Sequence, residues 1–109
     1  MIILTSEEAA GYEVVRVIGL VRGNTIRTRH LGKDIMAGLR GMVGGEIPEY
    51  TKLFAEAREQ ALDRMVEEAK DLGANAVLGV RFSTSMVMSS AAELLVYGTA
   101  VELATKPTR

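Results

Sequence analysis

The sequence predicts a single-domain α+β protein with the element order β-β-α-α-β-β. Its 109 residues are enough for one domain with one modest core, and 48% of them are hydrophobic. Segments rich in Val, Ile and Leu lie towards both ends of the chain, and a long amphipathic stretch lies between them. Strands that cluster apart from helices are typical of an antiparallel or mixed sheet with helices on one face.

Two strands are predicted before the helices. Residues 2–4 form a short apolar segment, and a turn is expected over residues 6–11. Residues 12–22 are rich in β-branched side chains and form the second strand. The stretch Gly23-Asn24-Thr25 is expected to bulge or bend this strand, which then resumes through Arg29.

Two helices are predicted in the middle of the chain. The apolar residues of 34–43 follow helical spacing, although Gly38 and Gly41 are unfavourable in a helix interior. These glycines form a smooth edge that another backbone can approach closely. A longer helix is predicted over residues 49–72, with Gly73 ending it. Its apolar stripe consists of Tyr50, Leu53, Phe54, Ala57, Ala61, Met65, Ala69 and Leu72.

Two more strands are predicted after the long helix, over residues 76–86 and 92–103. Residues 1–104 are therefore expected to form the single domain, and the polar residues 105–109 a frayed tail.

The strands predict a homo-oligomer because both of their faces are apolar. Strict alternation puts Val15, Val17 and Val21 on one face of the second strand. It puts Val14 and Leu20 on the other. The helices can cover only one face of a four-stranded sheet, and an apolar face left open is larger than monomers usually expose. A second copy of the chain is the expected cover.

Composition excludes several classes of function. The net charge of −1 gives no support for binding to nucleic acid or to a membrane surface. No apolar run approaches the length that spans a bilayer, and the first residues have no signal-peptide pattern. The absence of Cys excludes disulfides, thiolate metal sites and Cys nucleophiles. A cytoplasmic location is expected.

Charge is distributed unevenly along the chain. Residues 16–40 hold six cations and one anion, whereas residues 46–71 hold eight anions and four cations. Such asymmetry serves anion binding or contact between like subunits, and solvated faces also produce it.

The basic stretch from Arg22 to His30 is the segment most typical of a binding site. In an extended chain, Thr25, Arg27 and Arg29 point one way, while Asn24 and His30 point the other. A helix N-terminus is expected just beyond, and helix N-termini favour anions. A small anionic ligand is one expectation, and pairing with an acidic helix of a neighbouring copy is the alternative. The candidate ligand-binding residues are Asn24, Thr25, Arg27, Arg29 and His30.

Short motifs along nearly the whole chain resemble the YbjQ-like family. They are Gly11-Tyr-Glu-Val-Val, Gly19-Leu-Val-Arg-Gly-Asn-Thr25, Gly44-Gly-Glu46, Gly73-Ala-Asn-Ala-Val77, Val80-Arg-Phe82 and Tyr97-Gly-Thr-Ala-Val101. The resemblance implies a subunit related to dodecin, with additional short strands that join subunits into a pentameric ring. The family carries the label "putative heavy-metal-binding", so the resemblance implies that activity, and it supplies no catalytic motif.

Two hypotheses about function follow. The first is a non-enzymatic ring that binds a small ligand or ion, or acts as an assembly module. The second is an enzyme with its active site at a subunit interface near Arg27 to His30. His30 is the only imidazole, so one chain has no convincing metal-ligand set, although a ring brings copies together. No cofactor and no catalytic residue are predicted.

Overall fold

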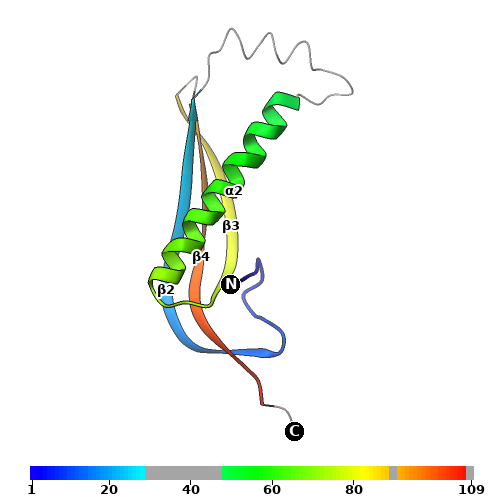
Figure 1. Ribbon diagram of the computed structural model, residues 1–109, viewed down its shortest axis with the longest axis vertical. Coiled ribbons are helices and arrows are strands. Elements are labelled where there is room, and N and C mark those ends of the chain that lie inside the picture. The colour runs from blue at the N-terminus through cyan, green and yellow to red at the C-terminus, as the bar shows by residue number, and fades with distance from the viewer. Residues whose placement is uncertain (29–47, 89–90, 108–109) are drawn as a thin grey trace.

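The computed structural model describes residues 1–28, 48–88 and 91–107. These form strands β1 (Ile2–Ile3), β2 (Tyr12–Thr28), β3 (Ala76–Met88) and β4 (Ala91–Thr105), and helix α2 (Pro48–Asp71). The strands build one sheet in the order β1-β3-β4-β2. Strand β1 is parallel to β3, and the other pairs are antiparallel. Helix α2 crosses one face of this mixed sheet (Figure 1), so the predicted α+β class is confirmed.

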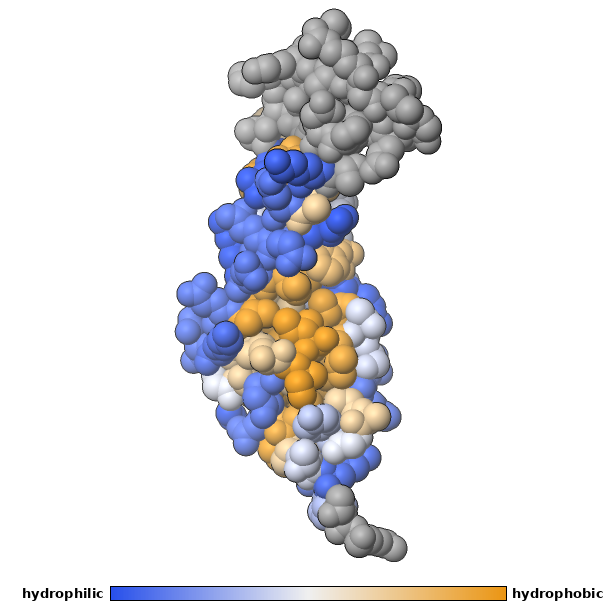
Figure 2. Space-filling model, turned by 45° about the vertical axis from the view of Figure 1, so that its right-hand side comes forward, coloured by the Kyte–Doolittle hydropathy of each residue, from blue (hydrophilic) through white to orange (hydrophobic). Residues whose placement is uncertain are grey.

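Helix α2 agrees closely with the long helix predicted over residues 49–72. Met65 and three alanines of the predicted stripe, Ala57, Ala61 and Ala69, are fully buried. The stripe packs against the valines of β2, β3 and β4 in the main core cluster. On the face of the surface seen in Figure 2, apolar residues gather midway along the molecule and are bordered by hydrophilic ones. The short helix predicted over residues 34–43 lies outside the described residues.

The end of α2 is a Schellman motif, as Gly73 predicted. Gly73 has a φ of +86°, which the missing side chain permits. Its amide donates to the carbonyl of Lys70 at 3.0 Å, and the amide of Ala74 donates to the carbonyl of Ala69 at 3.0 Å. Among the residues that the structure describes, no helix combines the length and apolar composition needed to cross a membrane.

The bulge or bend predicted in β2 at Gly23 is wrong. The strand runs through its 17 residues, and Gly23 pairs regularly with Val96 of β4. Gly23 is needed because α2 lies directly on it. A Cβ atom at this position would meet the carbonyl oxygen of Ala61 and lie 2.6 Å from the amide nitrogen of Met65.

The register of β2 shifts at two places that the sequence did not indicate. The shifts lie between Val14 and Arg16 and between Val17 and Gly19. Each adds one residue to β2, so side chains after it change faces. Val14, Val17 and Leu20 consequently share the side of the sheet turned away from α2, which we call the outer face, whereas Val21 is buried under the helix. The predicted assignment of Val17 to the face of Val21 is wrong for this reason.

The N-terminal segment covers one end of the outer face. A second core cluster lies there, formed by Ala76, Leu78, Val101 and Leu103, with Ile2, Leu4 and Ala9 packed against it. Backbone hydrogen bonds hold the segment along β3: Leu4 donates to the carbonyl of Val77 and accepts from the amide of Val80, both at 3.0 Å.

Candidate functional site

The predicted binding stretch lies at the far end of β2. The structure describes Asn24, Thr25 and Arg27, while Arg29 and His30 lie outside the described residues. The predicted alternation is observed: Thr25 and Arg27 face α2, and Asn24 faces the other way. These three side chains therefore do not converge on one point.

Thr25 and Arg27 bind the helix of their own chain. Thr25 is 2% exposed, and its hydroxyl donates to the carbonyl oxygen of Ala57 at 3.3 Å. Arg27 Nη2 donates to Gln60 Oε1 at 2.8 Å. The Nε of Arg27 is buried and has no hydrogen-bond partner within the described residues.

A shallow hollow beside Arg27 is lined by α2 residues, among them Glu56, Glu59 and Asp63. The basic residue thus lies against the acidic stretch of the same chain. This arrangement brings one cation of the basic stretch close to carboxylates of the acidic stretch within a single chain.

Asn24 is also engaged within the chain. Its Nδ2 donates to Glu93 Oε2 at 3.1 Å, and its backbone carbonyl accepts from Arg64 Nη1 at 2.6 Å. The bonds of Asn24, Thr25 and Arg27 link β2 to β4 and to α2. In the described part of the chain, the contacts of this stretch therefore stabilise the fold.

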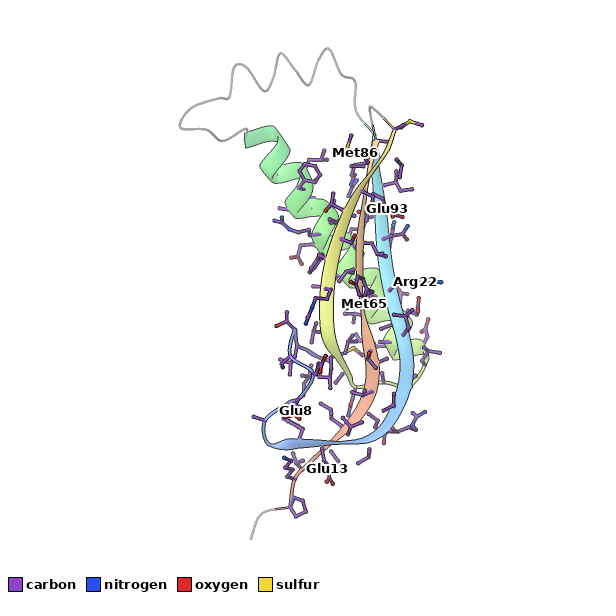
Figure 3. The ribbon with its side chains drawn as sticks, turned by 180° about the vertical axis from the view of Figure 1, so that it is seen from behind. Glu8, Glu13, Arg22, Met65, Met86 and Glu93 are labelled. Carbon is purple, nitrogen blue, oxygen red and sulfur yellow. The ribbon has the colours of Figure 1, made fainter. Side chains whose placement is uncertain are left out.

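The most conspicuous surface is the outer face of the sheet. Its exposed aliphatic residues are Val17 at 67%, Leu20 at 62%, Ile26 at 56% and Val14 at 45%. All four come from β2, and Tyr97 of β4 pairs beside them. Figure 3 shows this side, with α2 behind the sheet. The N-terminal segment, which packs at one end of this face, does not cover these side chains.

The sheet also has an open strand at each of its two edges. Strand β1 pairs only with Ala76 and Val77, so no described strand continues along β3 from Arg81 to Met88. Strand β2 is the last strand on the opposite side. Phe82 and Met86 near the open part of β3 are 47% and 71% exposed. Open edges of this length are sites where another strand can pair.

The described residues give little support for a metal site. Within residues 1–28, 48–88 and 91–107, no group of three or more His, Cys, Asp or Glu side chains is placed to hold a metal ion. The whole chain contains no Cys and a single His. Soft heavy metals prefer thiolate ligands, so the donor set of one chain does not fit them.

Comparisons with known proteins agree on family and fold. Residues 1–104 match the family model YbjQ_1, described as "Putative heavy-metal-binding". A UPF0145 protein from Methanosarcina acetivorans is 58% identical over 103 residues, covering 94% of this chain and 97% of that protein. A UPF0145 protein from Thermus thermophilus is 59% identical, covering 94% and 90%.

The fold is also similar to a solved structure. This is a protein of unknown function of the DUF74 family from Pediococcus pentosaceus, with a TM-score of 0.69 and 18% sequence identity. The similarity covers 95% of this chain and 98% of that one.

Proposed function

The chain belongs to the YbjQ family, and from this premise we propose that it works as a closed homo-oligomer, a pentameric ring, that binds a small ligand or organises an assembly rather than catalysing a reaction. The exposed outer face carries this proposal. Aliphatic side chains that are roughly half exposed gain about 1 kcal/mol each when a neighbour covers them. The open strand edges offer additional backbone hydrogen bonds to the same neighbour.

The non-enzymatic form is supported by the contacts of the predicted binding stretch. Asn24, Thr25 and Arg27 each donate a hydrogen bond within the chain, so all three side chains already have partners in the fold. The number of subunits follows the resemblance to the family. We propose a cytoplasmic location for the ring, with which the absence of Cys is consistent.

A charge on the outer face tests the proposal. Leu20→Lys places an ammonium group where we expect a subunit contact, and burying an unpaired charge costs several kcal/mol. We expect the oligomer to dissociate about a hundredfold more readily, as measured by light scattering over a dilution series. Glu67→Lys, which introduces the same ammonium group at an exposed position of α2, is the control and should leave the mass unchanged. Equal masses for both variants would contradict this interface.

A further inference from the structure

A hollow of about 490 Å³ lies on the outer face, where the N-terminal segment meets the sheet. This volume is in the range of small-molecule sites. One chain supplies all of its lining residues: Glu7, Val14, Val17, Leu78, Gly79, Arg81, Thr99 and Val101. It is separate from the basic stretch of β2, and it takes only Val14 and Val17 of the exposed outer face, so that Leu20 and Ile26 remain for the proposed subunit contact.

Backbone geometry positions the acidic wall of the hollow. Strand β3 has a register shift between Leu78 and Arg81, and Gly79 within it has a φ of +63°. The amide of Gly79 donates to the carbonyl of Ser6 at 2.9 Å. Arg81 Nη1 donates to the carbonyl of Thr5 at 2.7 Å. These two bonds fasten the backbone directly before Glu7 and so place this residue at the hollow.

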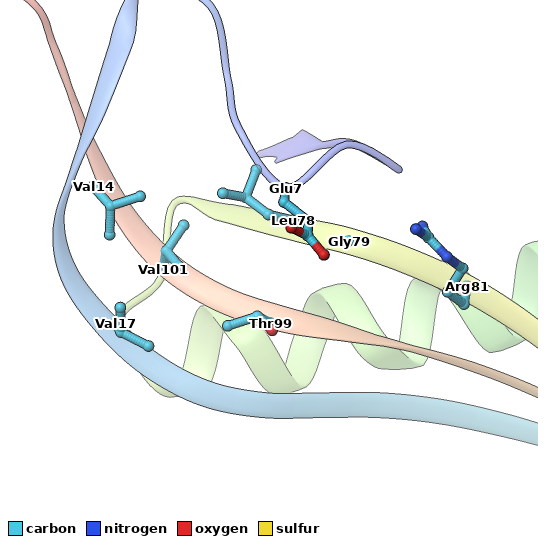
Figure 4. Close-up of a pocket in the computed structure, with 8 residues that line it drawn as sticks. All are labelled: Glu7, Val14, Val17, Leu78, Gly79, Arg81, Thr99 and Val101. Atoms are coloured by element: carbon cyan, nitrogen blue, oxygen red, sulfur yellow. The ribbon is translucent and has the colours of Figure 1, made fainter.

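The hollow has an apolar end and a polar end. In Figure 4, Val14, Val17 and Val101 lie together at one end, Arg81 lies at the other, and Glu7 lies between. Within the described residues, Glu7 and Arg81 form no ion pair with each other. Arg81 uses Nη1 for backbone carbonyls, which leaves its other N–H groups for a ligand.

We propose that this hollow binds a small zwitterionic molecule with an aliphatic body. The ligand's carboxylate accepts hydrogen bonds from Arg81, its ammonium group donates to Glu7, and its aliphatic part packs on the valines. A ligand with only a negative charge would be repelled by Glu7, and one with only a positive charge would be repelled by Arg81. A zwitterion satisfies both groups at once. This inference rests on the proposed ligand-binding function and names the class of ligand.

Three probes of similar size test the chemistry. Methyl spectra of the valine-labelled full chain are recorded during titration with norleucine, hexanoate and hexylamine. We expect norleucine to give saturable shifts at Val14, Val17 and Val101. Hexanoate and hexylamine should bind at least about tenfold more weakly, since each lacks one of the charge-assisted hydrogen bonds.

Matched carboxylate variants test the role of Glu7. Glu7→Gln should weaken norleucine binding about tenfold, and it should narrow the preference for norleucine over hexanoate. Glu8→Gln, the neighbouring change outside the hollow, should leave both affinities unchanged. Equal affinities for the three probes, no saturable valine shifts with norleucine, or equal effects of the two variants would each overturn the inference.

The oligomer mass of the same samples, measured by light scattering, distinguishes a failure of the ligand proposal from a failure of the ring proposal. A chain that binds norleucine as a monomer would contradict the ring and support the hollow. A ring without saturable valine shifts would contradict the hollow alone.

Discussion

Replacing Gly23 with Ala is expected to destabilise the protein strongly. In an open strand the same change stabilises by roughly 0.5–1 kcal/mol, because Gly loses more freedom on folding. Here the added Cβ would meet the carbonyl oxygen of Ala61 and lie 2.6 Å from the amide nitrogen of Met65. Both atoms belong to the backbone of α2, so no side-chain rotation relieves the clash.

The loss of stability depends on how far α2 must move to accommodate the added Cβ atom. The helix has to shift away from β2 as a body, which loosens the packing of Ala57, Ala61, Met65 and Ala69, all fully buried. Overpacking of a close-packed core costs about 1–3 kcal/mol, and rigid backbone neighbours favour the upper end. For a domain of this size, about 3 kcal/mol lowers the melting temperature by about 10–25 °C.

Thermal melting followed by circular dichroism measures this change, at one fixed protein concentration because assembly also affects stability. Asn24→Ala is the matched control. It alters the next residue of β2, on the outer face, and removes one exposed hydrogen bond to Glu93, so it should cost no more than about 1 kcal/mol. If Gly23→Ala melts at or above the temperature of the unchanged protein, the close contact between α2 and β2 is refuted.

Two further predictions come from the sequence. At least one of Gly38→Ala and Gly41→Ala is expected to destabilise the protein or its assembly, since an added methyl group would meet a backbone packed on that edge; unchanged mass with a raised melting temperature in both would contradict this. Elemental analysis after dialysis against a mild chelator is expected to find no stoichiometric copper, zinc or cadmium, because the chain has no Cys and one His; near-stoichiometric metal would show this reasoning to be wrong.

The elements that sequence predicted best are those with local causes. The stripe of Ala57, Ala61, Met65 and Ala69 specifies a helix by its spacing alone, and Gly73 specifies where that helix ends. The role of Gly23 could not be predicted in this way. Whether a strand glycine marks a bend or a close contact depends on where a helix docks, and the docking brings together residues far apart in sequence.

The faces of β2 show a second limit. Alternation is a sound rule within a regular ladder, and it placed Thr25 and Arg27 correctly on one side. It failed for Val17 because the register shifts depend on pairing with β4. The hollow was missed for a similar reason: Glu7 and Arg81 line the same hollow only because backbone hydrogen bonds and Arg81 fasten the N-terminal segment to β3.

The central claim is that the outer face is a contact between copies of this chain. Light scattering of the unmodified protein at micromolar concentration tests it most directly. We predict one closed species with five times the monomer mass of 11.8 kDa. A single species of 11.8 kDa, with nothing larger, would contradict it.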